Sequence, residues 1–283
     1  GFVHDALLGL SPKDVDLATS ARPEQIRKLF SNCRLIGKRF RLAHIYFGKE
    51  IIEVATFRAQ KDGREEYSKE GIIRRDNCYG TIREDAFRRD FGVNALFYDP
   101  IKKVIIDYCG GLKDIEAKKM RLIGKAKLRY HEDPMRILRA IRLCCKLPDF
   151  EIETQTHQAI KSKAALLDHI PNARRYDEYK KMFCNGHSEK NYHKLREEKL
   201  LRYLFPPLAS YTLQAQDKQF YHAAFVNSDQ RHKDQKSINP IFLISVLLWP
   251  VFMNDCTQKQ QQHPKHSFLG MSHEVIDSIF AHQ

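Results

Sequence analysis

Over the first 125 residues, short runs rich in Ile, Val, Phe and Tyr are separated by glycine, proline and charged residues. Such runs predict strands, because β-branched and aromatic side chains suit a half-buried sheet. The predicted strands are residues 34–36, 42–47, 51–57, 93–98 and 104–108. A helix is predicted at 23–30, with Pro23 near its start. The charged stretch 59–75 contains two glycines and predicts a mobile loop.

From about residue 126 the apolar positions recur at helical spacing instead. Asp133 and Pro134 precede an apolar-periodic stretch at 135–147, which is the usual composition of a helix start. Further helices are predicted at 154–167, 174–183 and 189–204. Residues 206–240 are polar and weakly patterned, and the glutamine-rich stretch 257–266 predicts a loop. The pattern therefore predicts an α/β head followed by a helical remainder.

The charge balance adds a class of partner. The 283 residues carry 48 Lys and Arg against 35 Asp and Glu, a formal net charge of +13. Such an excess favours polyanionic partners, either nucleic acid or the face of an anionic membrane. A solvated basic surface is the alternative, so charge alone does not decide between them.

Several other classes are disfavoured by the sequence. The seven cysteines are odd in number and show no CxxC spacing, which is typical of reduced thiols in a cytoplasmic protein. The apolar run 241–253 contains Pro250 and is too short to span a bilayer, so it predicts a buried helix and no membrane partner. Cys256, His263 and His266 match no standard zinc spacing, so we expect no structural zinc.

Carboxylates form the first candidate site. Asp14 and Asp16 are two residues apart, which in a strand places both side chains on one face. Two such charges repel each other unless a cation lies between them, and Mg²⁺ prefers oxygen ligands. Asp90, in the sequence RRDFGVNAL, precedes a predicted strand and is a third candidate. Three carboxylates can hold two metal ions that activate a hydroxyl and stabilise leaving pyrophosphate, although an isolated DxD pair is more often a surface turn.

Two further motifs follow along the chain. The sequence DYCGGLKD at 107–114 predicts a strand that ends in a glycine turn. The sequence EDPMRILRAIR at 132–142 starts the first predicted helix of the second half. Arg136 and Arg139 lie on one face of that helix, because they are three residues apart.

In this order the motifs resemble those of the class II nucleotidyltransferases, the family of bacterial poly(A) polymerases and CCA-adding enzymes. The family pattern is GGxxRD, DxD, RRDFxxNA, DxxGGxxD and EDxxRxxR, and the resemblance extends from Gly1 to about Trp249. The segment LIGKRFRLAH at 35–44 resembles the poly(A) polymerase branch, because CCA-adding enzymes usually carry a shorter Gly-Phe-Gly type of segment there. Residues 51–58 resemble both branches.

The resemblance implies a fold and a set of site residues. It implies a nucleotidyltransferase head with a mixed sheet, and an all-helical neck and body. Asp14, Asp16 and Asp90 would be the catalytic ligands of Mg²⁺. Asp133 and Arg136 would face the incoming base, accepting from the adenine amino group and donating to its N1. The implied nucleotide-binding residues are Gly1, His4, Asp5, Arg89, Asn94, Asp133, Arg136, Arg139 and Arg142.

The sequence departs from the family pattern at its ends. His4 occupies the place of an arginine that holds the nucleotide's phosphates, and a shorter, largely neutral side chain there predicts weaker binding. The first glycine of the opening pair is absent. We therefore expect an N-terminally truncated head at 1–125, a neck that binds base and RNA at 126–205, and a C-terminally truncated RNA-binding body at 206–283.

The expected reaction is transfer of AMP from ATP to RNA 3′ ends, with release of pyrophosphate. CCA addition to tRNA and an inactive RNA-binding relative are the alternatives. Tyr176 and Tyr179 are either base-stacking or core residues. The residues expected to contact the RNA backbone, or else to form a solvated face, are Arg174, Arg175, Lys180 and Lys181.

Overall fold

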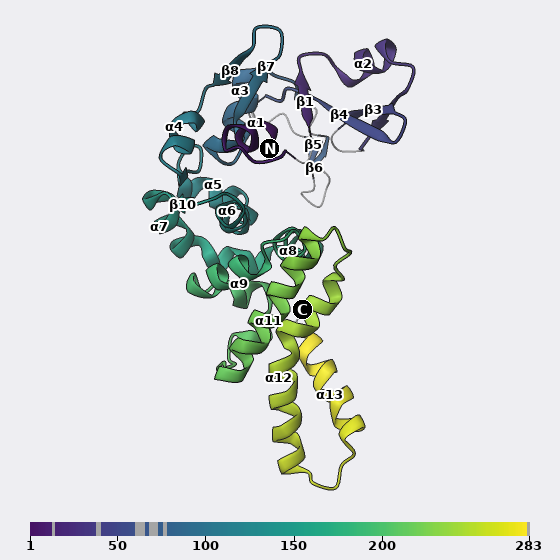
Figure 1. Ribbon diagram of the computed structural model, residues 1–283, viewed down its shortest axis with the longest axis vertical. Coiled ribbons are helices and arrows are strands. Elements are labelled where there is room, and N and C mark those ends of the chain that lie inside the picture. The colour runs from purple at the N-terminus through teal and green to yellow at the C-terminus, as the bar shows by residue number, and fades with distance from the viewer. Residues whose placement is uncertain (13–14, 38–40, 60–65, 68–72, 76–77, 282–283) are drawn as a thin grey trace. The chain divides into compact units, whose positions relative to one another are not determined.

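The structure is a computed structural model that describes residues 1–12, 15–37, 41–59, 66–67, 73–75 and 78–281. The chain divides into two compact units, Gly1–Ala126 and Lys127–Gln283 (Figure 1). The first unit combines short helices with strands, and the second is built of helices. The mixed α/β composition of the head and the helical composition of the remainder confirm the predicted fold class.

A four-stranded mixed sheet organises the start of the first unit. Its strand order is β1-β4-β3-β2. β1 runs parallel to β4, whereas β3 is antiparallel to both of its neighbours. Three of these strands confirm predicted ones to within one residue at each end. The strands are β1 (Asp16–Thr19), β2 (Cys33–Ile36), β3 (Leu42–Phe47) and β4 (Glu50–Thr56).

One face of this sheet is covered by the helix α2 (Pro23–Leu29), which follows β1 along the chain. Ile26 of α2 packs against apolar side chains from three strands, among them Ala43 and Val54. Successive side chains of a strand point to opposite faces, so the alternate positions of β3 and β4 lie on the other face. α2 therefore decides which face of the sheet is left for polar side chains.

The remainder of the first unit is a series of short elements. α3 begins at a capping box, in which the Thr81 hydroxyl accepts from the Glu84 N–H at 3.2 Å and Glu84 accepts from the Thr81 N–H at 2.7 Å. Such a box fixes the first turn of a helix. The elements are α1 (Phe2–Leu7), β5 (Glu66–Tyr67), β6 (Ile73–Arg75), α3 (Ile82–Arg88), η1 (Gly92–Asn94), β7 (Leu96–Asp99), β8 (Val104–Asp107), α4 (Gly111–Glu116) and β9 (Lys119–Met120).

Two predictions for this unit need correction. The stretch 59–75 is not all loop, because β5 and β6 pair as antiparallel strands within it. The predicted strand at 93–98 begins later, at Leu96, because the preceding residues form the 3-10 turn η1. The predicted strand at 104–108 is confirmed as β8, one residue shorter.

The glycine turn after β8 is organised by one carboxylate. Asp107 Oδ1 accepts hydrogen bonds from the N–H groups of Cys109, Gly110 and Gly111 at 2.8–3.0 Å, and Oδ2 accepts from that of Leu112 at 2.9 Å. Gly110 has φ 77°, a conformation that glycine adopts readily. A β-carbon on Gly111 would lie 2.2 Å from the carbonyl oxygen of Gly92, so only glycine lets α4 approach η1.

The second unit consists of helices with short connections. The predicted helices at 135–147, 154–167 and 174–183 are confirmed, and that at 189–204 is two helices. The elements are α5 (Ala126–Glu132), which begins one residue before the unit, α6 (Met135–Lys146), β10 (Glu151–Ile152), α7 (Thr154–Lys163), η2 (Ala164–His169), α8 (Asn172–Phe183), α9 (Ser188–Glu197), α10 (Leu201–Leu204), η3 (Pro206–Leu208), α11 (Ala215–Lys233), α12 (Pro240–Gln262) and α13 (Phe268–Phe280).

Aromatic side chains form much of the core of this unit. The rings of Phe183 and Phe225 have their centroids 5.7 Å apart, and those of Tyr192 and Phe225 are 5.0 Å apart. Tyr221 is fully buried beside them, and its hydroxyl donates to the carbonyl of Leu247 at 2.6 Å. Aromatic contacts of this kind add to the burial of apolar area, and here they join α8, α9 and α11, while the Tyr221 hydrogen bond joins α11 to α12.

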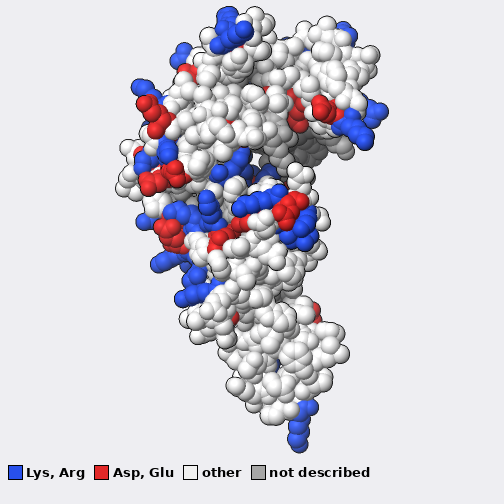
Figure 2. All heavy atoms as spheres, viewed as in Figure 1, with Lys and Arg blue, Asp and Glu red and all other residues white. Residues whose placement is uncertain are grey.

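The C-terminal third departs from the predictions in two places. Residues 215–233 form the 19-residue helix α11, which the weak pattern did not predict, because its buried stripe includes the polar residues Asp217 and Ser228. The glutamine-rich stretch is helical as far as Gln262, which is consistent with the good helix propensity of glutamine. In Figure 2, charged side chains are sparse over α12 and α13, and Lys and Arg gather over the preceding helices.

The predicted apolar helix lies within α12, and it is longer than expected. With 23 residues, α12 is long and apolar enough by length and composition to cross a membrane, unlike the shorter run considered from sequence. Its buried residues Leu243, Leu247 and Val251 lie on the side that packs among the other helices. Ile241 and Phe242 are 64% and 59% exposed, so the helix is only partly covered.

The Asp107 cradle yields a prediction for the first unit. Burial on its own raises the pKa of Asp107, but the N–H groups of the turn together lower it below its ordinary value. Asp107→Ala should leave these donors unsatisfied and lower the local opening free energy by roughly 1–3 kcal/mol. Hydrogen exchange of the amides of residues 109–112 measures this loss, with Glu116→Ala on exposed α4 surface as the control.

The sign of the pH dependence follows from the lowered pKa. The ionised carboxylate stabilises the turn above its unfolded-state pKa, and this contribution is lost as the pH falls through the lower folded-state pKa. The protection factors of these amides should therefore fall on acidification in the parent protein and stay flat in Asp107→Ala. Equal pH dependence in both proteins would contradict this account of the turn.

Candidate active site

The open face of the mixed sheet carries a row of charged side chains. In the parallel register of β1 and β4, Asp16 is the partner of Glu53. In the antiparallel register of β3 and β4, His44 is the partner of Glu53, and its Nε2 lies 3.3 Å from Glu53 Oε2. Partners on neighbouring strands share a face. Asp16 and Glu53 therefore stand side by side on the face opposite α2.

Glu53 was not among the residues selected from sequence. It is a single acidic residue in the apolar stretch Ile51–Ala55, at a position where a partly buried charge needs a reason. An acidic residue within an apolar strand was the feature of the sequence that could have identified Glu53 as a site residue. The distance of 37 residues along the chain conceals its pairing with Asp16, which only the strand register reveals.

Next to this carboxylate pair lies a pocket of about 250 Å³. Ala18 and Ala55 line it, and each is two residues beyond a member of the pair on the same strand. Because strand residues two apart share a face, the pocket continues the open face that carries the pair. Small side chains at these two positions leave room there. The other lining residues are Thr56, Arg58, Asp85, Arg88 and Arg89.

The electrostatics of this pocket favour an anion. Among its described lining residues, three are arginines and one, Asp85, is a carboxylate. Asp85 accepts from Arg89 Nε and Nη2 at 3.3 and 3.2 Å, and from the N–H of Arg58 at 3.2 Å. Arg89 Nη1 also donates to the carbonyl of Asn94 at 2.9 Å. Guanidinium groups held in this way match the geometry of phosphate oxygens.

Asp90 has a different environment from the pair on the sheet. It is 6% exposed, and its Oδ1 accepts from the N–H of Phe91 at 2.9 Å and from the side-chain amide of Asn94 at 3.1 Å. These bonds hold the turn η1 that follows Asp90. Asn94 thus donates to Asp90 from its side-chain amide and accepts from Arg89 at its backbone carbonyl.

Of the three predicted metal ligands, the structure describes Asp16 and Asp90. Asp14 lies outside the described residues, as do residues 38–40 of the segment that resembles the poly(A) polymerase branch. Within the part of the chain that the structure describes, no group of three or more His, Cys, Asp or Glu side chains could hold a metal ion. The joint role of Asp14, Asp16 and Asp90 stays a prediction.

The N-terminal residues contact both Asp16 and the turn that follows Asp90. A β-carbon on Gly1 would be 3.9 Å from Asp16 Oδ2, and the Gly1 amino group is 3.2 Å from His4 Nδ1. His4 Nδ1 is also 3.3 Å from the carbonyl of Val93, in the turn after Asp90. His4 and Asp5 are 2% and 4% exposed, and their side chains are 3.3 Å apart. These contacts connect Asp16 to the η1 turn within the first unit.

The predicted base-binding residues lie in the second unit, at the junction of α5 and α6. Both Asp133 carboxylate oxygens accept from Arg174 Nη2 at 3.0 Å, and Oδ1 also faces the N–H of Met135 at 3.3 Å. Arg136 Nη1 donates to the carbonyl of Arg129 at 2.6 Å and to Glu132 at 3.1 Å. The structure therefore fixes both side chains through neighbours, and their contact with a base stays a prediction.

The remaining arginines of α6 have different surroundings. Arg142 Nε donates to Glu178 Oε1 of α8 at 2.6 Å, and Glu178 is buried. This ion pair ties α6 to α8. Arg139 is half-buried on α6, one turn from Arg136. A nucleotide contact of Arg142 would have to share its guanidinium with Glu178.

The four cations expected to contact RNA are not equivalent. Arg174 is paired with Asp133, and Lys180 Nζ is 3.0 Å from Asp177 and 4.9 Å from the Tyr176 ring. Lys181 is exposed. Arg175 donates to the carbonyl of Tyr203 at 2.9 Å and to the side chain of Asn172. Two of these charges are thus compensated by carboxylates, which weakens the expectation that they form a common RNA path.

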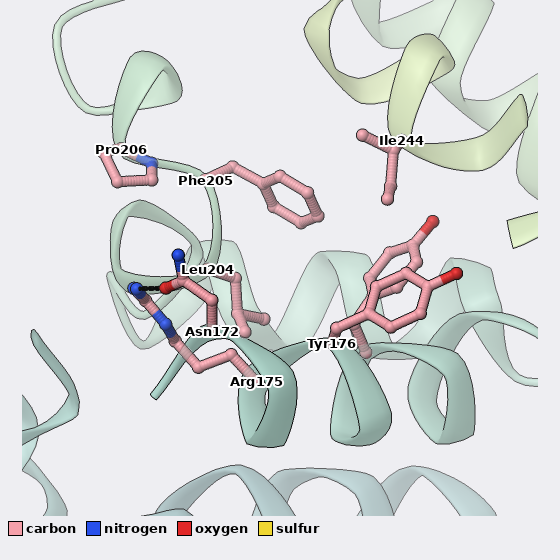
Figure 3. A pocket seen from close by; sticks show the side chains of 8 residues that line it. Asn172, Arg175, Tyr176, Leu204, Phe205, Pro206 and Ile244 are labelled. Carbon is pink, nitrogen blue, oxygen red and sulfur yellow. Dashed lines mark hydrogen bonds between the residues drawn. The ribbon is translucent and has the colours of Figure 1, made fainter. Parts of the chain in front are cut away.

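The two tyrosines of α8 also differ. Tyr179 is 2% exposed and its hydroxyl donates to the carbonyl of Pro240 at 2.9 Å, so it is a core residue. Tyr176 is 39% exposed. Figure 3 shows it in a pocket of about 230 Å³ with Phe205 and Ile244.

The carboxylate pair predicts a metal-binding phenotype. Glu53→Gln removes one of two adjacent negative charges, so the affinity for Mn²⁺, used as a probe for Mg²⁺, should fall by roughly tenfold or more. Calorimetric titration measures it. Glu50→Gln is the matched control, because Glu50 begins the same strand at an exposed position of the other face.

Asp16→Asn should give the same loss as Glu53→Gln. If Glu53→Gln binds Mn²⁺ as tightly as the parent protein while Asp16→Asn does not, Glu53 has no place in the metal site.

Comparison with known proteins gives the family. The model of the poly A polymerase head domain matches residues 1–121, and that of the probable RNA and SrmB-binding site of polymerase A matches residues 149–212. Poly(A) polymerase I of Haemophilus influenzae is 48% identical over 258 residues, which cover 88% of this chain and 57% of that protein. The chain thus spans little more than half the length of this relative.

More distant relatives share the fold. A CCA-adding enzyme of Bacillus licheniformis is 35% identical over 182 residues, which cover 64% of this chain and 44% of that protein. A solved tRNA nucleotidyltransferase, complexed with a primer tRNA and an incoming ATP analogue, superposes with a TM-score of 0.68 at 25% identity, covering 88% of this chain and 70% of its own. The chain therefore belongs to the nucleotidyltransferase family of poly(A) polymerases and CCA-adding enzymes, and it is more similar to the poly(A) polymerases.

Proposed function

We propose that this chain carries the catalytic machinery of a polynucleotide adenylyltransferase, which transfers AMP from ATP to the 3′ hydroxyl of RNA. The observation that carries the proposal is the pair Asp16 and Glu53 beside a pocket lined by three arginines. The higher identity to poly(A) polymerase I than to CCA-adding enzymes supports adenylate as the transferred group.

Asp16 and Glu53 are proposed to hold Mg²⁺, together with Asp14 and Asp90 from the sequence motif. The donor set fits a hard divalent ion, because it consists of carboxylate oxygens and two of them are adjacent on one face. The chemistry that Mg²⁺ supplies in such a site is activation of the attacking hydroxyl and neutralisation of charge on the leaving group.

The arginine pocket is proposed to bind the triphosphate of ATP. Arg58, Arg88 and Arg89 would each present a guanidinium to phosphate oxygens, and Asp85 keeps Arg89 in place. The 3′ oxygen of RNA forms a bond to the α-phosphorus, and the bond from that phosphorus to the bridging oxygen breaks. Pyrophosphate and the hydroxyl proton are released. Positioning and charge stabilisation supply most of the rate in such transfers.

Base selection is proposed for Asp133 and Arg136. A carboxylate accepts from the amino group of adenine, and a guanidinium donates to its N1, so the protein provides the hydrogen bonds of a template. The Arg174 guanidinium donates to both carboxylate oxygens of Asp133 and so fixes the orientation of this acceptor. Gly1, His4, Asp5, Asn94, Arg139 and Arg142 complete the proposed nucleotide-binding set.

RNA 3′ ends are the proposed acceptor, and the cytoplasm is the proposed compartment. The match of residues 149–212 to a probable RNA-binding model supports the first proposal, as does the net charge of +13. The seven cysteines, all of which lie in the described part, are unpaired, and this supports the second proposal.

The direct test is nucleotide incorporation into labelled RNA with ATP alone, CTP alone, or both. We expect extension with ATP alone. Asp16→Asn should lower the rate roughly 1000-fold or more, because the loss of about 4 kcal/mol of charge stabilisation corresponds to that factor. Extension that requires both nucleotides on tRNA would assign CCA addition instead, and no incorporation would leave an RNA-binding relative.

Base selection gives a second prediction. Arg136→Ala removes a charged donor, whose hydrogen bond is worth about 1.5–3 kcal/mol, so kcat/KM for ATP should fall and its ratio to that for CTP should approach one. The ratio is informative because a general loss of folded protein would lower both values equally. Lys127→Ala, on an exposed position of α5, is the control. An unchanged ratio in Arg136→Ala would remove this residue from base recognition.

A further inference from the structure

A second charged pocket lies wholly within the helical unit, between α9, α10 and α11. It has a volume of about 470 Å³, and four cationic side chains line it. Arg196 and Lys199 come from the end of α9, Arg202 from α10, and Lys218 from the first turn of α11. Three tyrosines also line it: Tyr211 is partly exposed, whereas Tyr192 and Tyr221 are 2% and 1% exposed and belong to the core beneath it.

The positive charge of this pocket is not compensated. Among the residues that the structure describes, none of the four cations makes an ion pair with a carboxylate, and no Asp or Glu lines the cavity. The nearby Asp217 is occupied by the Tyr211 hydroxyl and the N–H of Gln214, both at 2.8 Å. This is the reverse of the situation on α8, where Arg174 and Lys180 are paired with carboxylates.

Tyrosine rings orient the two guanidinium groups. The Arg196 guanidinium carbon lies 5.7 Å from the centroid of the Tyr192 ring. That of Arg202 lies 4.8 Å from the Tyr203 ring, and its Nη2 donates to the Tyr203 hydroxyl at 2.8 Å. Such contacts hold a cation in place without cancelling its charge.

Lys199 occupies a backbone position that glycine would fill at lower cost. It follows α9 with φ 55°, in the left-handed region. The N–H of Leu200 bonds to the carbonyl of Leu195 at 2.8 Å, and that of Lys199 to Arg196 at 3.0 Å, which is the Schellman pattern of helix ends. Any residue with a β-carbon is strained in this conformation, whereas glycine is not. The helix end thus places the Lys199 side chain at the lining of the pocket.

We propose that this pocket binds one nucleotide of single-stranded RNA, with the phosphates on either side of it on the four cations and its base against Tyr211 and the leucine side chains. The inference rests on the proposed function in one respect, namely that RNA is the polymer held. Cations interleaved with aromatic rings are the usual means of binding single strands, because phosphates and base faces are then contacted together. The pocket lies at residues separate from the nucleotide-binding set.

Charge reversal in the full 283-residue chain tests the proposal. The probe is a short fluorescein-labelled oligoadenylate, titrated at several salt concentrations. Lys199→Glu with Lys218→Glu should weaken binding at least tenfold. The slope of log affinity against log salt should become less negative by roughly 1.4, because each phosphate contact on a single strand contributes about 0.7. The matched control is Lys161→Glu with Lys233→Glu, which changes the net charge equally at exposed positions of α7 and α11.

Lys199→Gly separates binding from folding. Glycine relieves the left-handed conformation, so this variant should unfold no more easily than the parent, yet its salt slope should become less negative by roughly 0.7. A 4-thiouridine-containing oligonucleotide should in addition crosslink to the peptide that contains Tyr211. Equal binding by the double variant and its control would overturn the proposal.

The remaining outcomes identify a different occupant. Displacement of the oligonucleotide by excess AMP, lost in the double variant, would assign the pocket to a free nucleotide and overturn the proposal. Displacement by polyglutamate alone would assign it to an acidic protein segment, with the same consequence. AMP incorporation is measured in parallel: a chain that incorporates nothing but loses RNA binding in the double variant would contradict the proposed function and leave this pocket supported.

Discussion

The parallel pairing of β1 with β4 is the constraint on which the candidate active site depends. Parallel neighbours cannot be joined by a tight turn, so α2, β2 and β3 lie between them in the chain. The register places Asp16 beside Glu53 and, two residues further, Ala18 beside Ala55. A slip of one residue would turn Asp16 toward the apolar face covered by α2, where a carboxylate has no partner.

This register places two negative charges, those of Asp16 and Glu53, next to each other on the open face of the sheet. Two adjacent carboxylates on the open face repel each other, and the pocket that continues this face is lined by three arginines and the carboxylate of Asp85. A divalent cation would relieve the repulsion between the two carboxylates. Other contacts stabilise the surrounding structure. The Thr81–Glu84 capping box fixes the start of α3, and Asp85 holds Arg89. Stability and binding capacity thus come from different residues of one unit.

The sequence predicted features that local pattern encodes. Short runs rich in Ile, Val, Phe and Tyr predicted β3 and β8, and helical spacing after Pro134 predicted α6. It did not reveal Glu53, because strand register joins residues that are far apart in the chain. For the same reason it did not reveal that Arg174 binds Asp133, 41 residues away. α11 was missed because its buried stripe includes the polar residues Asp217 and Ser228, of which Asp217 accepts hydrogen bonds from Tyr211 and Gln214 just before the helix.

The proposed function depends above all on the binding of a metal–triphosphate complex by the open face of the sheet. A crystal structure of the chain with Mn²⁺ and a non-hydrolysable ATP analogue tests it most directly, because Mn²⁺ is located by its anomalous signal. The account predicts a Mn²⁺ peak within coordination distance of Asp16 and Glu53, with triphosphate oxygens against Arg58, Arg88 or Arg89. Mn²⁺ bound away from both carboxylates, or a triphosphate held outside the arginine pocket, would contradict it.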